Sequence, residues 1–345
     1  MPDKALQDRP ELRAPMPWQQ SQWQRLWQRF ERGQMAHAHL LSGEQGLGKK
    51  AFARDFARLM LCRSPVRQQA CGTCVTCRQG GAHYHPDIFL LEVEEGSKEI
   101  KIQQVRAVSE FALRSSHAGG AKIVLIYDAH RLNGNAANAL LKTLEEPSSS
   151  TYLFLVSDLP GRLLPTIRSR CQKLAFPLPS REHANAWLHN FLSDSETDEL
   201  LRASGNRPLR ALELSGSDEL QVQREFIDGL SKLASGNISL QSLLARSLKT
   251  GESRVLRYLS QTSSILIKYL LSDQLPQQSD QLSKDFCASI NIEKGRLTSV
   301  VKQLLGFYQE VELARGQLSS STNPNPQLIM ESLLWRWSKL PLSIR

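Results

Sequence analysis

Long hydrophobic runs are missing from this sequence of 345 residues. No stretch of about 18 apolar residues occurs, so we expect no transmembrane helix. The first ten residues, MPDKALQDRP, are polar and have no apolar core, so we expect no signal peptide and place the chain in the cytoplasm. Cysteine is scarce, and in that compartment the six cysteines are expected to be reduced thiols or metal ligands, which excludes a disulfide framework.

Basic residues outnumber acidic ones, 43 to 34, and give a net charge of +9. Such a charge is compatible with binding to nucleic acid, because clustered Lys and Arg gain affinity by releasing counterions from phosphates. No single block concentrates the charge, however, and a basic surface with no such role fits equally well. The length predicts two or three domains.

Strands and helices alternate in the first half of the chain. Apolar runs predict buried strands at 39–43, 123–127 and 152–157, and apolar residues at helical spacing predict helices at 17–32, 101–113 and 135–147. This alternation predicts an α/β fold with an open parallel sheet. Beyond residue 175 the patterns are mostly helical, and we expect three domains, at 1–176 (α/β), 177–218 (small, helical) and 219–345 (larger, helical).

The segment GEQGLGKK at 43–50 resembles a phosphate-binding loop between a strand and a helix. Gly43, Gly48 and Lys49 match the pattern, and Gly46 adds a third glycine. Lys50 stands where a Ser or Thr hydroxyl should bind Mg²⁺.

Asp128 ends the strand pattern IVLIYD and suits the second magnesium position of an ATPase. Ala129 follows, where active ATPases commonly carry a glutamate that polarises the attacking water. Because Lys50 and Ala129 affect independent parts of the mechanism, together they favour loss of hydrolysis.

Four cysteines lie close together, at spacing C-x8-C-x2-C-x2-C: Cys62, Cys71, Cys74 and Cys77. Four thiolates with short spacers suit a structural, tetrahedral zinc site, and free or redox-active thiols are the alternative. His83 and His85 could replace a cysteine, but we interpret them as loop or packing residues. Isolated Cys171 and Cys287 are expected to be ordinary buried residues.

The segment TIRSRCQKL at 166–174 reads, from composition alone, as a basic helix end. The chain resembles the delta-prime family of bacterial DNA polymerase III clamp-loader subunits, within the AAA+ superfamily. The resemblance rests on these segments, in this order: HAHLLSGEQGLGKK, the cysteine insert, HPD, DAHRLNGNAANALLKTLEEP and LLPTIRSRC. The resemblance covers nearly the whole chain and implies an AAA+ P-loop domain with a zinc-binding insert, a small helical lid and a helical collar.

That resemblance also implies a function. Members of the family act as non-hydrolysing stators in a heteropentameric ring with delta and gamma/tau subunits, which loads the sliding clamp onto primer–template DNA. The arginine of Ser169-Arg170-Cys171 would then serve ATP bound on a neighbouring subunit, and the chain's own loop would not bind ATP productively. Arg168 is a weaker candidate for that arginine, and neither Ser157 nor Arg210 is given a role.

Two other functions remain open from the sequence. One is an active ATPase of the gamma/tau type that tolerates Lys50 and Ala129. The other is a zinc-dependent nucleic-acid-binding module built on an inactive P-loop.

Overall fold

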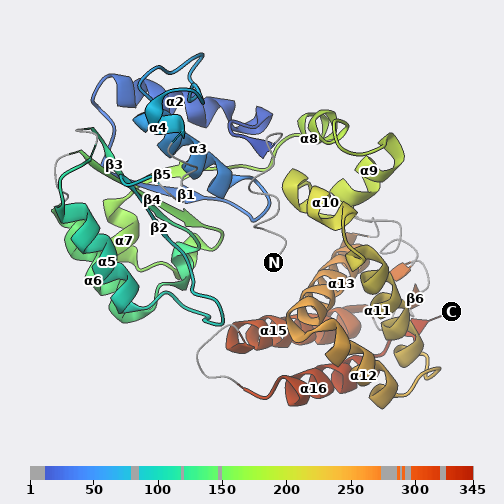
Figure 1. Ribbon diagram of the computed structural model, residues 1–345. Helices are drawn as coiled ribbons and strands as arrows, with labels where there is room; N and C mark the ends of the chain where they lie inside the picture. Colours follow the sequence, from blue (N-terminus) through green and yellow to red (C-terminus); the bar gives the residue numbers. More distant parts are fainter. Residues whose placement is uncertain are drawn as a thin grey trace. The chain divides into compact units, whose positions relative to one another are not determined.

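The computed structural model describes residues 12–78, 85–117, 120–146, 150–272, 286–287, 290–291, 297–318 and 324–344. The chain forms two compact units (Figure 1). The first comprises Met1–Phe191 with Asn206–Glu213, and the second comprises Leu192–Gly205 with Leu214–Arg345. The division at residues 177 and 219 stays a prediction. Among the described helices, none is both long enough and apolar enough to cross a membrane.

The first unit contains a five-stranded sheet in the order β2-β3-β4-β1-β5, and every pairing is parallel. The fold class predicted from the alternation of strands and helices is therefore confirmed. The strands are β1 (Ala38–Ser42), β2 (Ile88–Leu91), β3 (Lys122–Ile126), β4 (Thr151–Ser157) and β5 (Gln172–Ala175).

Two of these strands, β2 and β5, were not among the predicted ones, and both form edges of the sheet. Each has only four residues. In β5, exposed and buried residues alternate, so the apolar run that marks a buried parallel strand is absent. Parallel pairing with β1 and β3 stabilises segments that are too short to be recognised alone.

Helices cover both faces of the sheet (Figure 1). On one face, Trp23 packs edge-on against Phe52 and Phe56, and Phe154 completes the cluster from β4. The aromatic stripe of residues 17–32 is thus core packing, as expected. The elements of this face are η2 (Pro17–Gln19), α2 (Gln20–Glu31), α3 (Lys49–Leu61) and α4 (Val75–Arg78).

The other face carries a second core, in which Val124, Leu140 and Ile167 are fully buried. Asn133 caps α6 by accepting a hydrogen bond from the backbone N–H of Ala136 at 2.9 Å, as short polar side chains do at helix starts. The elements here are α5 (Ile102–Leu113), η3 (Ala129–Arg131), α6 (Gly134–Glu145), η4 (Pro160–Arg162) and α7 (Pro165–Arg170); α8 (Arg181–Leu188) and α10 (Pro208–Ser215) come later in the chain.

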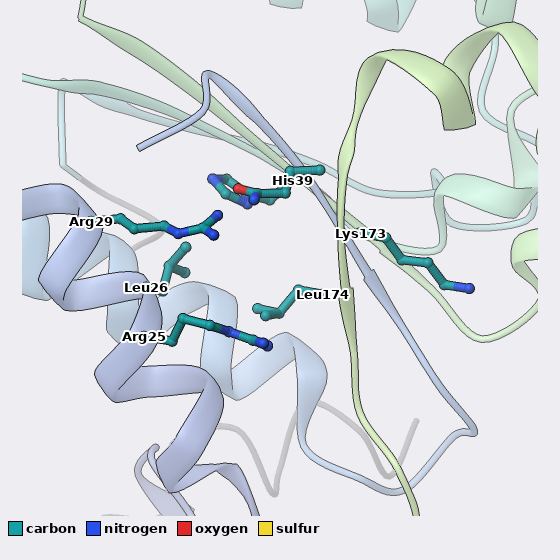
Figure 2. A pocket seen from close by; sticks show the side chains of 7 residues that line it. Arg25, Leu26, Arg29, His39, Lys173 and Leu174 are labelled. Atoms are coloured by element: carbon teal, nitrogen blue, oxygen red, sulfur yellow. The ribbon is translucent and has the colours of Figure 1, made fainter. Parts of the chain in front are cut away.

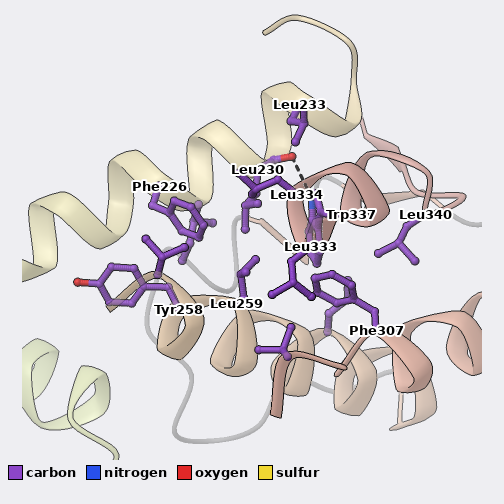
Figure 3. Packing of buried hydrophobic residues seen from close by; sticks show 14 of the residues in the cluster. Phe226, Leu230, Leu233, Tyr258, Leu259, Phe307, Leu333, Leu334, Trp337 and Leu340 are labelled. Carbon is purple, nitrogen blue, oxygen red and sulfur yellow. Dashed lines mark hydrogen bonds between the residues drawn. The ribbon is translucent and has the colours of Figure 1, made fainter. Parts of the chain in front are cut away.

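The second unit is built around one helical core, which Figure 3 shows. Trp337 is fully buried against Phe307, and its indole N–H donates to the carbonyl of Leu230 at 3.1 Å. The elements are α9 (Asp194–Ala203), α11 (Glu219–Ala234), α12 (Leu240–Thr250), α13 (Glu252–Ser272), α15 (Leu297–Leu318) and α16 (Pro326–Ser338), with short antiparallel strands β6 (Ile290–Asn291) and β7 (Ser343–Ile344).

His39, in the middle of β1, makes the stability of the first unit depend on pH. Its burial lowers the pKa of the imidazole from 6.5 to about 4. The unfolded chain therefore binds a proton at higher pH than the folded chain does. Stability from this residue is complete above pH 6.5 and is lost as the pH falls towards 4.

We expect His39→Leu to flatten that dependence. Between pH 7 and pH 4.5 the wild-type chain should lose about 2–3 kcal/mol more unfolding free energy than the variant, at about 1.36 kcal/mol per pKa unit. Urea unfolding at the two pH values measures the difference. Equal losses in the two proteins would show that His39 is not responsible.

Candidate functional site

The glycine-rich loop joins the carboxyl end of β1 to the start of α3, as expected of a phosphate cradle. Gly46 and Gly48 adopt positive φ angles of 85° and 79°, which favour glycine. A Cβ atom on Gly46 would lie 2.8 Å from the Cβ of Arg210, and one on Gly48 would lie 2.7 Å from Nε2 of Gln19. The turn and its close packing therefore require these glycines, whether or not a phosphate binds there.

Lys49 is the lysine of the loop pattern, and its side chain is bonded inside the chain. The residue is only 4% exposed. Its Nζ lies 2.6 Å from Oδ1 of Asp158 and donates to the carbonyl oxygen of Glu44 at 2.5 Å. Burial lowers the pKa of Lys49, and the Asp158 carboxylate opposes that shift. A phosphate would have to compete with these two partners for the ammonium group.

Lys50 and Asp128 pair with each other. The Nζ of Lys50 donates to Oδ2 of Asp128 at 3.0 Å and lies 5.5 Å from the ring centroid of Tyr127. In an active P-loop ATPase, the hydroxyl and the aspartate at these two positions hold Mg²⁺ between them. Here an ammonium group neutralises the aspartate directly.

Ala129 begins η3 and is fully buried. Its methyl group has no atom that could orient a water molecule. The next residue, His130, contacts Ser157 at the end of β4, with its Nδ1 3.4 Å from the serine Oγ. Burial lowers the pKa of His130.

Arg210, to which the sequence assigned no role, forms an ion pair inside α10. Its Nη1 lies 2.9 Å from Oε2 of Glu213.

The Ser169-Arg170-Cys171 segment ends α7 and leads directly into β5. Arg170 donates from Nη1 to the carbonyl of Thr166 at 3.0 Å, and its Nη2 lies 2.5 Å from Oε1 of Glu145. The arginine side chain is 36% exposed and the Glu145 side chain 48%, so the pair lies at the surface. Ser169 donates to Thr166 as well, at 3.0 Å.

Cys171 and Cys287 are buried, as predicted. Burial raises the pKa of Cys171 to about 12, so its thiol is not reactive at neutral pH. Arg168 is exposed on the same helix as Arg170.

Arg170 and the loop lie at opposite ends of the strands. The loop follows the carboxyl end of β1, whereas Arg170 precedes the amino end of β5. Because Gln172 pairs with His39 and Ala175 with Ser42, the parallel strands β1 and β5 run side by side. A strand of four residues, at about 3.3 Å per residue, is about 13 Å long from one end to the other. The loop and Arg170 therefore lie beyond opposite ends of the neighbouring strands β1 and β5.

The four cysteines predicted as metal ligands come together in the structure. Their Sγ atoms all lie within 4.8 Å of one another, and those of Cys71 and Cys77 are 3.9 Å apart. Tetrahedral zinc with Zn–S bonds of about 2.3 Å requires S···S separations of about 3.8 Å. The geometry fits zinc.

Backbone N–H groups already point at the thiols. Cys71 N–H donates to Sγ of Cys62, and Cys74 N–H donates to Sγ of Cys71, both at 3.3 Å. The bond from Cys74, with help from Thr73, lowers the pKa of Cys71 to about 6, while burial raises the pKa of Cys77 to about 12. Hydrogen bonds to ligand sulfurs are typical of structural metal sites.

His85, the described histidine near the cysteines, is not part of this cluster. His85 is buried, and its Nδ1 accepts a hydrogen bond from the backbone N–H of Asp87 at 3.1 Å, which fits the packing role expected of it. His83 lies outside the described residues.

A parallel sheet in the order β2-β3-β4-β1-β5, with a glycine loop between β1 and α3 and helices on both faces, defines a P-loop protein of the AAA+ class. The family model described as "DNA polymerase III, delta subunit" matches residues 18–180. The chain is 36% identical to the DNA polymerase III subunit delta' of Pseudomonas aeruginosa, over 94% of this chain and 98% of that protein. It belongs to the DNA polymerase III delta' subunit family.

A second subunit delta' supports this assignment, and a subunit tau is also similar to this chain. The chain is 36% identical to the subunit delta' of Escherichia coli, over 62% of this chain and 65% of that protein. It is also 29% identical to the DNA polymerase III subunit tau of Salmonella typhimurium, over 62% of this chain and 32% of that protein.

Two partners in these sites were missed by the sequence analysis. Asp158 directly follows Ser157 at the carboxyl end of β4, and the loop also lies at the carboxyl ends of the strands. This position in the sequence could have indicated a contact between Asp158 and the loop. Glu145 lies in the helix LEEP motif, but nothing local in the sequence indicates that it contacts Arg170, which comes 25 residues later.

Proposed function

We propose that this chain is the non-hydrolysing stator of a clamp loader, and that it supplies Arg170 to ATP bound on a neighbouring subunit. The observation that carries the proposal is the Lys50–Asp128 ion pair at the loop together with an exposed arginine. Lys50 neutralises Asp128 where Mg²⁺ would bind, and Ala129 replaces the residue that would polarise water. Arg170, in contrast, is accessible at the surface.

The position of Arg170 supports action in trans. The loop follows the carboxyl end of β1 and Arg170 precedes the amino end of β5, which supports a role away from the chain's own loop. At the surface, the arginine can neutralise charge on a phosphoryl group held by another chain. Its contacts with Glu145 and Thr166 would hold the side chain in place until the neighbour docks.

The wider assembly follows from the family. We propose that residues 219–345 form the collar that joins this chain to delta and gamma/tau subunits in a five-membered ring, and that residues 177–218 form the lid. The assembled cytoplasmic complex would load the sliding clamp onto primer–template DNA. The isolated chain would bind DNA weakly, because a single subunit supplies few phosphate contacts.

The purified chain alone is expected to hydrolyse no ATP above the rate of a Lys49→Met variant. Lys50→Thr should not restore activity, because Ala129 still cannot polarise water. Phosphate release at saturating ATP and Mg²⁺ measures both. The Cys287→Ser variant, altered in the other unit, serves as a preparation control.

The alternative is an active ATPase of the gamma/tau type, which the similarity to a tau subunit favours. Hydrolysis by the wild-type chain that disappears in Lys49→Met would establish that alternative and contradict the stator proposal.

A further inference from the structure

A hollow lies between α2 and the β5 edge of the sheet, away from the loop and the cysteines. It encloses about 340 Å³ of empty space, part of it open to solvent. Leu26 and Leu174 form its apolar wall. Its polar lining residues are Arg25, Arg29, His39, Gln172 and Lys173, and Lys173 directs its side chain away from the two arginines (Figure 2). Among the described residues, no aspartate or glutamate lines it.

His39 is the most deeply buried of these polar residues. It is 1% exposed, and neither of its ring nitrogens has a hydrogen-bond partner in the part of the chain that the structure describes. The carbonyl of Ala36 acts to raise the pKa of the ring against the effect of burial, but its geometry does not make a hydrogen bond to either ring nitrogen. A buried imidazole with an unused N–H is costly, and such groups in native proteins generally have a partner.

Arg25 and Arg29 are one helical turn apart on α2, so both project from the same face. Figure 2 shows the guanidinium of Arg29 directed towards His39 and that of Arg25 towards Leu174. The charge of Arg29 acts on the His39 ring and helps to lower its pKa. Within the described ranges neither arginine forms an ion pair. Two cations therefore face one space, with no carboxylate from the described part of the chain beside them.

The walls of the hollow are fixed by the fold. Gln22, on α2, donates from Nε2 to the carbonyl of Ala175 at 3.1 Å and ties the helix to the edge strand. His39 pairs with Gln172 in the parallel register of β1 and β5. A ligand would meet donors that are already in position, which reduces the cost of binding.

We propose that this hollow binds a phosphate group, with Arg25, Arg29 and the N–H of His39 as donors and Gln172 as a further polar contact. Guanidinium groups bind phosphate through paired, charge-assisted hydrogen bonds. A tetrahedral phosphate offers oxygens to donors that converge from a helix and two strands, whereas a carboxylate offers only two. The phosphate comes either as the free ion or as the monoester of a small molecule.

The test uses the full-length chain, with inorganic phosphate and adenosine 5'-monophosphate as probes at constant ionic strength. The imidazole NMR resonances of His39 report binding at this site alone, independently of any phosphate held by the loop. We expect saturable shifts in the wild-type chain and at least tenfold weaker binding in Arg29→Ala.

Lys173→Ala is the matched control. It removes one positive charge from β5, but Figure 2 shows the Lys173 side chain leaving the strand on the side away from the two arginines. Its affinity for phosphate should equal that of the wild type.

Comparing the probes identifies the source of the phosphate. Equal affinities assign the site to the free ion, and tenfold tighter binding of the nucleotide assigns it to a monoester. The proposal is overturned if neither probe gives a saturable shift at His39, or if Arg29→Ala and Lys173→Ala weaken binding equally.

Discussion

Arg170→Ala is expected to abolish most of the DNA-dependent ATP hydrolysis that depends on this subunit in a reconstituted clamp loader. An arginine supplied in trans is worth roughly 10³–10⁵ in rate, so we expect a loss of at least about 10³-fold at the site that it serves. A single-turnover ATPase assay of the reconstituted complex with primed DNA measures this loss.

Folding and assembly should survive the substitution. Arg170 and Glu145 form a surface pair, with side chains 36% and 48% exposed. Such pairs contribute about 0–1 kcal/mol to stability. Co-purification of the variant with its partner subunits, together with an unchanged thermal midpoint, would show that the loss arises in the chemical step.

Arg168→Ala is the matched control, because it removes an exposed arginine from the same helix. It should keep most of the activity. Glu145→Gln should also keep activity, since it removes only the negative charge that holds Arg170 in the free chain. If Arg168→Ala caused the large loss and Arg170→Ala did not, the assignment of the arginine would be wrong.

The second large effect is expected at the four cysteines. The wild-type chain should contain about one zinc per molecule, and Cys71→Ser/Cys74→Ser should contain almost none. Binding free energies of structural zinc in small peptides are about 10–16 kcal/mol at neutral pH. Because the site here is an insert on an already folded unit, we expect a smaller loss of unfolding free energy, on the order of several kcal/mol.

Metal analysis and thermal unfolding, with and without a chelator, measure the two effects. Cys287→Ser controls for the loss of a thiol, because Cys287 is buried in the core of the second unit and far from the metal-ligand cluster in sequence. That variant should keep its zinc. A native chain that contains no zinc and is equally stable after chelation would contradict the metal site.

The sequence predicted those features that depend on local patterns. The strands β1, β3 and β4 are apolar runs, and the helices α2, α5 and α6 have apolar residues at helical spacing. The edge strand β5 has no such run and depends on pairing with β1.

The same distinction holds for the sites. The cysteine cluster is predictable because its ligands are close in sequence. The unusual lysine at position 50 is visible from the loop pattern alone, although its ion pair with Asp128 is not. The partners of Lys49 and Arg170, and the hollow around His39, bring together residues from separate elements. Their contacts exist only in the folded chain.

The most direct test of the central claim compares two variants in the same reconstituted complex. Lys49→Met disables the chain's own loop, whereas Arg170→Ala disables the group offered to a neighbour. Steady-state ATP hydrolysis with primed DNA should be unchanged by Lys49→Met and strongly reduced by Arg170→Ala. The reverse result, a large loss with Lys49→Met and none with Arg170→Ala, would contradict the account.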